Sequence, residues 1–277
     1  MSSVPAGGSA VVTGAARGLG LAIAAALHAD GWRVLVTDVD AAGAARAAEP
    51  LGGWSAGLDV RDEAGCAAVA AEADRRDGLG LWVNNAGILA TGPAWTQDAA
   101  ARRQIIEVNA LGAMNGTLAA LAVMRRRGAG HVLNVVSLAG LVAAPGETVY
   151  AASKHALLAF SLGTLADLRG AGVRGIDISC LCPDGIWTPM LHDRLDDPQA
   201  AASFTGALLR PEAVAARAAR LARRPRPVVT MPGWRGAQVR LLDALPGLAV
   251  RLTPVVAAVG RAGQRRQRRR LSDRGRP

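Results

Sequence analysis

The only tyrosine and the only lysine of the chain, Tyr150 and Lys154, stand four residues apart. In a helix this spacing places both side chains on one face, one turn from each other. A phenol is a poor acid–base catalyst at neutral pH because its pKa is about 10, but a neighbouring ammonium favours the phenolate and lowers that pKa. The pair therefore predicts a general acid or base. The alternative is a surface tyrosine next to a solvated lysine.

Ser137 adds a hydroxyl to this pair. It stands 13 residues before Tyr150, at the end of a predicted strand. From there the hydroxyl could hydrogen-bond a substrate oxygen and hold it against the phenol. The three residues together predict a proton transfer to or from a substrate oxygen.

A glycine-rich turn follows the first predicted strand and precedes a helix. Glycines let the backbone turn sharply and approach a pyrophosphate, which rests on the N–H groups and positive end of the following helix. Glycines also serve ordinary tight turns, so the place between strand and helix is what makes the motif informative. The turn consists of Thr13, Gly14, Ala15, Ala16, Arg17, Gly18, Leu19 and Gly20.

Asp38 ends the second predicted strand, 24 residues after Gly14. A carboxylate at this point can accept hydrogen bonds from the adenosine ribose hydroxyls and would repel a 2′-phosphate. It therefore favours NAD over NADP as the cofactor. Arg17 acts in the opposite sense, because a guanidinium near the phosphates would offset the repulsion. A solvated turn residue is the alternative interpretation of Asp38.

These residues need a scaffold that brings strand ends together, and the rest of the sequence predicts one. Short β-branched or apolar segments alternate with alanine-rich segments of helical periodicity, which indicates βαβ units and a parallel sheet covered on both faces. We expect one α/β domain over residues 1–235. The predicted strands are residues 10–13, 33–37, 54–58, 81–84, 131–137, 175–181 and 228–231, and the predicted helices are residues 18–30, 41–49, 62–76, 97–127, 148–169 and 211–223.

Composition excludes several classes of protein. Of 277 residues 51% are apolar and 19% are charged, which excludes wholesale disorder. Three cysteines argue against a disulfide-stapled secreted scaffold and favour a reducing compartment. No run of about eighteen uncharged apolar residues and no basic-then-apolar N-terminus is present, so we expect neither a membrane span nor a secretory signal. No cluster of histidines or carboxylates has metal-ligand spacing, so no metal is expected.

Two regions interrupt the alternation of strands and helices. Residues 187–210 form a long connection that we expect to be a mobile flap over the substrate, with short helices. Residues 236–277 form a C-terminal extension. Its last part, residues 261–277, holds eight arginines and one aspartate, most of the net charge of +10. This tail is predicted to be disordered.

The apolar and basic residues 240–259 of the extension allow two interpretations. Their leucines can pack on the body or on a neighbouring subunit, which general preference for burial favours. They can also lie on an anionic membrane surface, because arginines alternate with leucine and valine. A nucleic-acid role for the tail would be non-specific, since residues 261–277 contain no aromatic side chain to stack on bases.

Taken together, these residues resemble the short-chain dehydrogenase/reductase family over residues 8–235. The glycine turn is similar to that family's T-G-x-x-x-G-x-G motif. The resemblance also rests on Asn84, Asn85, Ala86 and Gly87 as its N-N-A-G, on Leu58, Asp59 and Val60 at its adenine-contacting position, and on Asn109, which stands 28 residues before Ser137. It implies a Rossmann-type, doubly wound parallel sheet of about seven strands and hydride transfer between a nicotinamide dinucleotide and an alcohol or carbonyl carbon.

The resemblance also implies roles for single residues. Tyr150 exchanges a proton with the substrate oxygen, Ser137 orients that oxygen, and Lys154 binds the nicotinamide ribose and lowers the pKa of Tyr150. Asn109 holds a water that relays the proton. The implied cofactor-binding residues are Gly14, Arg17, Gly18, Leu19, Gly20, Asp38, Asp59, Val60, Asn85, Ala86, Gly87, Tyr150, Lys154, Pro183, Ile186 and Thr188.

One position departs from the family pattern. The family usually has glycine directly after the proline that corresponds to Pro183, but here Asp184 follows and Gly185 comes next. The Asp184 carboxylate either points to solvent or lies near the nicotinamide and substrate. With it, the predicted substrate pocket comprises Leu89, Leu138, Ala139, Glu147, Trp187, Met190 and Leu191.

Because that set is mainly apolar, we expect a lipophilic secondary alcohol or its ketone as substrate. We also expect the enzyme to be cytoplasmic, either free or peripheral to a membrane through residues 236–277. The family resemblance implies a homodimer or homotetramer. The alternatives are a dinucleotide-binding regulator without catalysis and a scaffold that associates with membrane or RNA through the basic tail.

Overall fold

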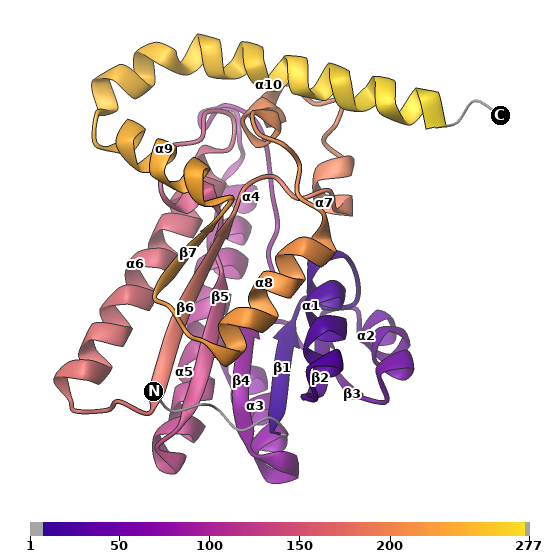
Figure 1. Cartoon of the computed structure of the whole chain (residues 1–277), viewed down its shortest axis with the longest axis vertical. Helices are drawn as coiled ribbons and strands as arrows, with labels where there is room; N and C mark the ends of the chain where they lie inside the picture. Colours follow the sequence, from indigo (N-terminus) through magenta and orange to yellow (C-terminus); the bar gives the residue numbers. More distant parts are fainter. Residues whose placement is uncertain (1–7, 275–277) are drawn as a thin grey trace.

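A parallel sheet of seven strands organises the computed structural model, which describes residues 8–274 (Figure 1). The strand order is β3-β2-β1-β4-β5-β6-β7. Strands β2 and β3 are added on one side of β1 and strands β4 to β7 on the other, so the strand order switches between β1 and β4. Ligands of such sheets bind outside the carboxyl ends of the strands at this switch point. The predicted fold class is confirmed. The strands are β1 (Ser9–Thr13), β2 (Arg33–Asp38), β3 (Trp54–Gly57), β4 (Leu79–Asn84), β5 (Gly130–Val135), β6 (Ile176–Pro183) and β7 (Val228–Met231).

Helices cover both faces of the sheet. On one face α1 (Gly18–Ala29), α2 (Ala41–Ala48) and α8 (Pro211–Arg223) bury side chains against Val12 and Val36. On the other face α3 (Glu63–Asp77), α5 (Ala113–Arg127) and α6 (Thr148–Gly170) pack against Val11 and Leu35. Neighbouring strand residues point to opposite faces, and both faces are buried, so each strand is a continuous apolar run.

The helix predicted over residues 97–127 is one helical segment with an irregular middle. It comprises α4 (Ala99–Ile106), the π-helical turn η2 (Glu107–Gly112) and α5. By length and composition alone this segment could cross a membrane, but 56% of its most apolar window is buried inside the protein. A buried core helix passes the same test, and this one packs on the sheet.

The flap begins with α7 (Pro189–His192) and η4 (Pro198–Phe204). Short turns η1 (Glu49–Leu51) and η3 (Leu138–Gly140) precede it in the chain. The C-terminal extension forms two helices, α9 (Gly233–Asp243) and α10 (Pro246–Arg274). Figure 1 shows α10 across one end of the molecule, above the flap.

The predicted disorder of the tail is wrong for residues 261–274, which form the second half of α10. Gln264 Nε2 donates a hydrogen bond to the Asp197 carbonyl oxygen at 2.7 Å, and Arg268 Nε lies 2.7 Å from Asp196 Oδ1. These contacts attach the helix to the flap. Arginine and glutamine also have high helix propensity, which an interpretation based on low complexity overlooks. Residues 275–277 of the predicted tail lie outside the described residues.

Two glycines let α10 approach the flap closely. A Cβ at Gly260 would overlap the backbone of Ala201, and a Cβ at Gly263 would overlap the carbonyl oxygen of Phe204. Glycine is therefore required at both positions by the contact between α10 and η4. This contact attaches α10 to the flap.

Candidate active site

A cavity of about 1140 Å³ lies at the carboxyl ends of the strands. It extends from the glycine turn after β1, past the end of β4, to the start of α6, and α9 and α10 form its far wall. All predicted site residues line it except Asn109 and Trp187. Residues as distant in the chain as Gly14 and Val259 thus line one cavity.

The glycine turn has the conformation that a dinucleotide-binding turn needs. Gly14 has a φ of +62°, and a Cβ there would come within 2.7 Å of Ala86 Cα. Asn85 Nδ2 donates hydrogen bonds to the carbonyl oxygens of Thr13 and Gly14, both at 3.0 Å. The turn is thereby fixed against the end of β4. No side chain caps the N-terminus of α1, so its N–H groups face the cavity as an anion-binding end.

Asp38 lies at the outer end of the cavity, at the end of β2. Its Oδ2 accepts a hydrogen bond from the Ala16 amide at 3.1 Å, and its Oδ1 accepts one from the Asp40 amide at 3.1 Å. The carboxylate is thus fixed beside the glycine turn instead of turning freely in solvent. Arg17, also on the lining, has an exposed side chain.

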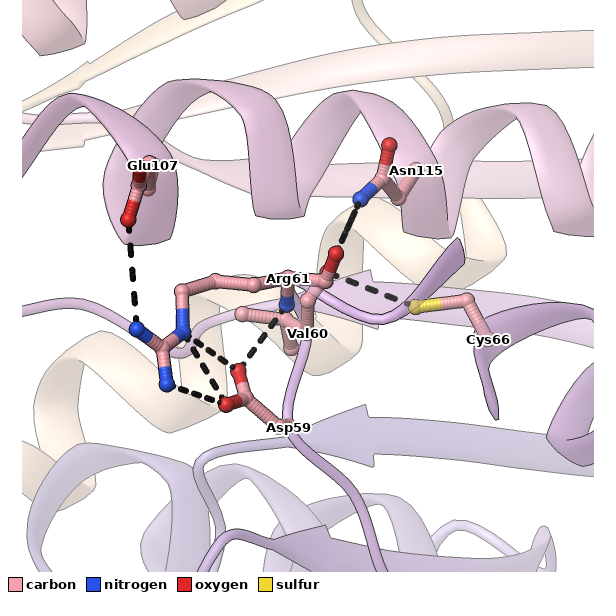
Figure 2. Close-up of polar contacts among 6 residues, drawn as sticks. All are labelled: Asp59, Val60, Arg61, Cys66, Glu107 and Asn115. Atoms are coloured by element: carbon pink, nitrogen blue, oxygen red, sulfur yellow. Dashed lines mark hydrogen bonds and ion pairs between the residues drawn. The ribbon is translucent and has the colours of Figure 1, made fainter. Parts of the chain in front are cut away.

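The Asp59 carboxylate pairs with Arg61 (Figure 2). Arg61 Nε lies 3.0 Å from each carboxylate oxygen, and this hydrogen bond lowers the pKa of Asp59. The neighbouring Val60 carbonyl accepts a hydrogen bond from Asn115 Nδ2 at 3.1 Å. Segment 59–61 is therefore held from two sides next to the cavity, with the carboxylate engaged by an arginine that sequence reasoning did not consider.

Tyr150 lies near the N-terminus of α6, half-buried in the wall of the cavity. Burial raises the pKa of Tyr150 above its ordinary value and the charge of Glu147 raises it further, while a hydrogen bond with Ser137 acts in the opposite sense. The expectation that Lys154 lowers this pKa stays a prediction, since Lys154 is not among the causes of the shift. Desolvation of the phenolate outweighs the favourable interactions.

Lys154 lies one turn further along α6 and is 4% exposed. Its Nζ donates to the Val135 carbonyl oxygen at 2.9 Å and lies 5.7 Å from the centre of the Tyr150 ring. Burial lowers the pKa of Lys154 to about 8. An ammonium has three N–H donors, and the one hydrogen bond found leaves two of them for groups in the cavity.

Ser137 begins the turn η3 after β5. Its Oγ accepts a hydrogen bond from the Ala139 amide at 3.1 Å. That contact orients the oxygen and leaves its own proton free to donate, so Ser137 can present an O–H to a substrate oxygen or to Tyr150. The predicted serine, tyrosine and lysine are thus brought together at the inner end of the cavity.

Asn109 lies behind this group, in the π-helical turn η2. Its Oδ1 accepts from the Ile88 amide at 2.8 Å, and its Nδ2 donates to the Ile88 carbonyl at 2.9 Å and to Ser153 Oγ at 3.1 Å. Ser153 Oγ in turn donates to the Tyr150 carbonyl at 2.6 Å. The side-chain amide therefore positions α6 and the β4 loop, and the implied water-holding role of Asn109 stays a prediction.

Two pocket residues are carboxylic acids with different partners. Glu147 is 2% exposed and accepts a hydrogen bond from Ser203 Oγ at 2.7 Å; burial raises the pKa of Glu147 to about 7. Asp184 Oδ2 lies 2.9 Å from Arg235 Nε. Asp184 lines the cavity, as predicted for the substrate pocket, and its carboxylate is paired with Arg235 of α9 instead of pointing to solvent.

Trp187 is the predicted pocket residue that the structure places elsewhere. Its ring packs edge-on against His192, with centroids 5.2 Å apart, and against the small apolar cluster beneath the flap. The flap has its own small core, and the half-buried ring of Trp187 packs against it and does not line the cavity. The other apolar pocket residues, Leu89, Leu138, Ala139, Met190 and Leu191, line the cavity as predicted.

The sequence profile of the family described as short chain dehydrogenase matches residues 9–199. This match covers more than half of the chain. The chain belongs to the short-chain dehydrogenase family, a family of oxidoreductases.

Individual members of the family agree with this assignment. The chain is 36% identical over 202 residues to 2-(R)-hydroxypropyl-CoM dehydrogenase of Xanthobacter autotrophicus, which covers 69% of this chain and 79% of the relative. It is 34% identical over 208 residues to cyclopentanol dehydrogenase of Comamonas sp., with 72% of this chain and 81% of the relative covered. The crystal structure of a short chain dehydrogenase/reductase from Burkholderia phymatum in complex with NAD superposes with a TM-score of 0.79 at 28% identity, covering 90% of this chain and 97% of that one.

The cavity of this short-chain dehydrogenase fits a dinucleotide along its length. The uncapped N-terminus of α1 would hold the pyrophosphate, and Asp38 would accept from the ribose at the outer end. At the inner end the buried ammonium of Lys154 retains donors for a second ribose. Ile186 and Thr188 line the space between these ends, and the Cβ of Thr188 lies 3.9 Å from where a Cβ of Gly18 would be.

Sequence reasoning missed three features of this short-chain dehydrogenase. Ser153 links Asn109 to Tyr150, and Arg235 pairs with Asp184. Neither Ser153 nor Arg235 had a signal in the sequence, because only the fold brings each of them near its partners. The third is the apolar wall that α9 and α10 add to the cavity, which includes Val239, Leu242, Ala249, Leu252 and Val256.

The geometry of the described residues supports neither a redox-active pair of cysteines nor a metal site. The three cysteines are buried and free, and burial raises the pKa of Cys180 to about 11 and that of Cys182 to about 12. Within residues 8–274 no group of three or more histidine, cysteine or carboxylate side chains is arranged to hold a metal ion.

Proposed function

We propose that the protein is a NAD-preferring dehydrogenase that interconverts a lipophilic secondary alcohol and its ketone, with Tyr150 as general acid and base. One observation carries this proposal. Tyr150, which is half-buried, and Lys154, which is buried, lie on one face of α6, at the inner end of a cavity whose outer end holds the glycine turn and Asp38.

The preference for NAD follows from Asp38. Two backbone amides fix its carboxylate beside the glycine turn, where a negative charge would repel a 2′-phosphate. Arg17 is exposed at the same end but makes no ion pair with Asp38 in the described structure. The NAD complex of the related Burkholderia phymatum enzyme supports the same preference.

The protein's own side chains would carry out the proton transfer. A bound nicotinamide dinucleotide would supply the acceptor or donor of hydride. The Ser137 hydroxyl would donate to the substrate oxygen and hold it beside the phenol, and Tyr150 would take or return the proton of that oxygen. Lys154, protonated below its pKa of about 8, would favour the phenolate during the transfer.

The substrate class follows from the lining of the inner cavity. Leu89, Leu138 and the α9 and α10 side chains Val239, Leu242 and Val256 form apolar walls around Tyr150 and Ser137. Such a space binds an apolar body and orients a single hydroxyl or carbonyl through a few polar groups. Two relatives carry the names of secondary alcohols, a 2-hydroxypropyl compound and cyclopentanol, which supports this class.

The test is turnover by the purified protein with NAD and a panel of cyclic and open-chain secondary alcohols. We expect reduced nicotinamide to form, with kcat/KM increasing from small to bulky apolar alcohols and a lower value with NADP. Tyr150→Phe should retain cavity shape and NAD binding but lose about 10² to 10⁴-fold in kcat. Undiminished turnover by a correctly folded Tyr150→Phe protein would exclude the mechanism. NAD binding without turnover of any alcohol or ketone would favour the regulator instead.

The homodimer or homotetramer implied by the family stays a prediction. Leu118 on α5 and Leu162 on α6 are exposed in the single chain, which supports pairing through these helices.

A further inference from the structure

Helices α9 and α10 concentrate exposed apolar side chains, some of which line the active-site cavity and some of which do not. Eight of the fourteen large hydrophobic side chains that are exposed among residues 8–274 lie between residues 234 and 271. Leu241, Leu245 and Leu248 are 65%, 48% and 47% exposed, and none of them lines the active-site cavity. Exposed apolar groups gathered on one element mark an interaction surface, whereas scattered ones do not.

The second half of α10 adds positive charge to this surface. Arg261, Arg265, Arg266, Arg269 and Arg270 are exposed and make no ion pair with a side chain of residues 8–272, whereas Arg268 pairs with Asp196. Arg265, Arg266, Arg269 and Arg270 surround a shallow depression together with Ala262. Like charges one turn apart on a helix repel each other, so an anionic partner would relieve their repulsion.

Apolar residues and arginines share one side of α10. Leu248, Val255, Val259, Arg266 and Arg270 recur at alternating intervals of seven and four residues, a spacing that keeps them on one helix face. All five are exposed. Figure 1 shows that this helix lies across one end of the molecule, and Val255 and Val259 on this side also line the active-site cavity.

We propose that α9 and α10 dock the protein onto the surface of an anionic lipid bilayer. The leucines of α9 and of the connection to α10 would enter the boundary between headgroups and acyl chains, and the arginines would bind lipid phosphates. Arginine suits this position because its apolar stem can lie along the lipid surface while its guanidinium reaches the headgroups.

The same observations disfavour other occupants. A nucleic acid would engage the arginines but leave Leu241, Leu245 and Leu248 in water, and the described part of the tail offers no aromatic side chain for base stacking. A second copy of the chain would bring two sets of unpaired arginines to one interface. An anionic bilayer satisfies both the leucines and the arginines.

Docking onto a bilayer would also affect how the substrate reaches the active site, and this point alone rests on the proposed function. Leu252, Val255, Val256 and Val259 of α10 all line the cavity, and Val255 and Val259 are also 57% and 49% exposed. The helix that would contact lipid is thus also a wall of the substrate cavity. A lipophilic alcohol dissolved in the bilayer would reach Tyr150 without crossing water.

The experiment is co-sedimentation of the full-length protein with vesicles, which needs no catalytic activity. We expect binding to vesicles of phosphatidylcholine and phosphatidylglycerol at about 0.1 M salt, little binding to phosphatidylcholine alone, and release at about 1 M salt. The charge variant R265Q/R266Q/R269Q/R270Q and the apolar variant L241S/L245S/L248S should each lower the vesicle partition coefficient about tenfold or more. Thermal melts and circular dichroism should show that both variants are folded.

Matched controls remove the same residue types elsewhere. Trp95→Ser removes an 87% exposed apolar side chain, and R125Q/R126Q removes two adjacent arginines at the end of α5. Both should bind vesicles like the wild type.

Several outcomes would overturn the proposal. The first is no binding to anionic vesicles, and the second is equal binding to neutral vesicles. The third is binding that survives the leucine substitutions, because the attraction would then be non-specific attraction between a cationic helix and an anionic surface. Duplex DNA or RNA binding without vesicle binding would point to the nucleic-acid occupant. A dimer in sedimentation velocity that L241S/L245S/L248S dissociates, again without vesicle binding, would assign the surface to a second copy.

Discussion

Asp184 and Arg235 form the most buried ion pair among residues 8–274. Their side chains are 7% and 14% exposed, and Arg235 Nε lies 2.9 Å from Asp184 Oδ2. Arg235 also donates from Nη2 to Thr205 Oγ1 at 2.8 Å. The pair therefore joins the end of β6, the segment after η4 and α9, three parts of the chain that together enclose the inner cavity.

Removing one partner of this pair should destabilise the protein. Arg235→Ala leaves the Asp184 carboxylate buried without a counter-charge, and we expect a loss of about 2–4 kcal/mol in the free energy of unfolding. Because α9 carries part of the cavity wall, KM for a bulky alcohol should rise more than kcat falls. Urea unfolding and steady-state kinetics measure both effects.

The double variant D184A/R235A is the control. It removes both charges, so it should be less destabilised than the sum of the two single variants. Additive losses would show that the two side chains act independently, contrary to the ion pair seen here.

Asp38→Asn should weaken the discrimination between NAD and NADP. Asparagine keeps an oxygen that can accept from the Ala16 amide but carries no charge to repel a 2′-phosphate. We expect the ratio of kcat/KM for NAD to that for NADP to fall about tenfold or more, with Arg17 then available to the phosphate. An unchanged ratio would return Asp38 to the role of a turn residue.

Glu147 should make stability depend on pH in the opposite sense to an ordinary carboxylate. Its pKa is raised to about 7 from the usual 4.5 by burial, so the folded protein holds this proton more tightly than the unfolded chain does. The stability that the protonated group contributes is complete below pH 4.5 and is lost as pH rises through about 7. Glu147→Gln should therefore stabilise the protein at pH 8 by on the order of 3 kcal/mol and change little at pH 4.

The same substitution should also move the pH profile of alcohol oxidation. The charge of Glu147 raises the pKa of Tyr150, so Glu147→Gln should shift the alkaline rise of kcat/KM to lower pH. Thermal unfolding and kinetics across pH 4 to 10 test the two effects separately. A stability difference from wild type that is the same at all pH values would contradict the raised pKa.

Asn109→Ala should impair catalysis through position instead of proton transfer. It removes three hydrogen bonds at once, to the Ile88 backbone and to Ser153, leaving buried polar groups unsatisfied at a cost of about 1–3 kcal/mol each. Ser153→Ala removes the hydroxyl that accepts from Asn109 and donates to the Tyr150 carbonyl but keeps both bonds of Asn109 to Ile88, so it should lower kcat by a smaller factor. Wild-type kcat in Ser153→Ala would show that this link does not position the tyrosine.

Much of the fold was predictable because its signals are local. The order of strands and helices follows from apolar periodicity, and the glycine turn follows from its place between a strand and a helix. The π-helical turn at Asn109 had no such signal, since its sequence is compatible with an ordinary helix. The helix α10 was missed for a related reason, because Gly260, Gly263 and Gln264 have their partners in the flap.

The sequence by itself determined which groups do the chemistry. One tyrosine, one lysine and a serine at family spacing, together with a glycine turn and Asp38, are matters of residue type and local backbone form. Only the tertiary structure decided how these groups behave: that burial raises the pKa of Tyr150, that Asp184 is paired with Arg235, that Trp187 belongs to the flap core, and that α9 and α10 wall the cavity. The physical reason is that desolvation and charge pairing depend on neighbours in space, and those neighbours come from distant parts of the chain.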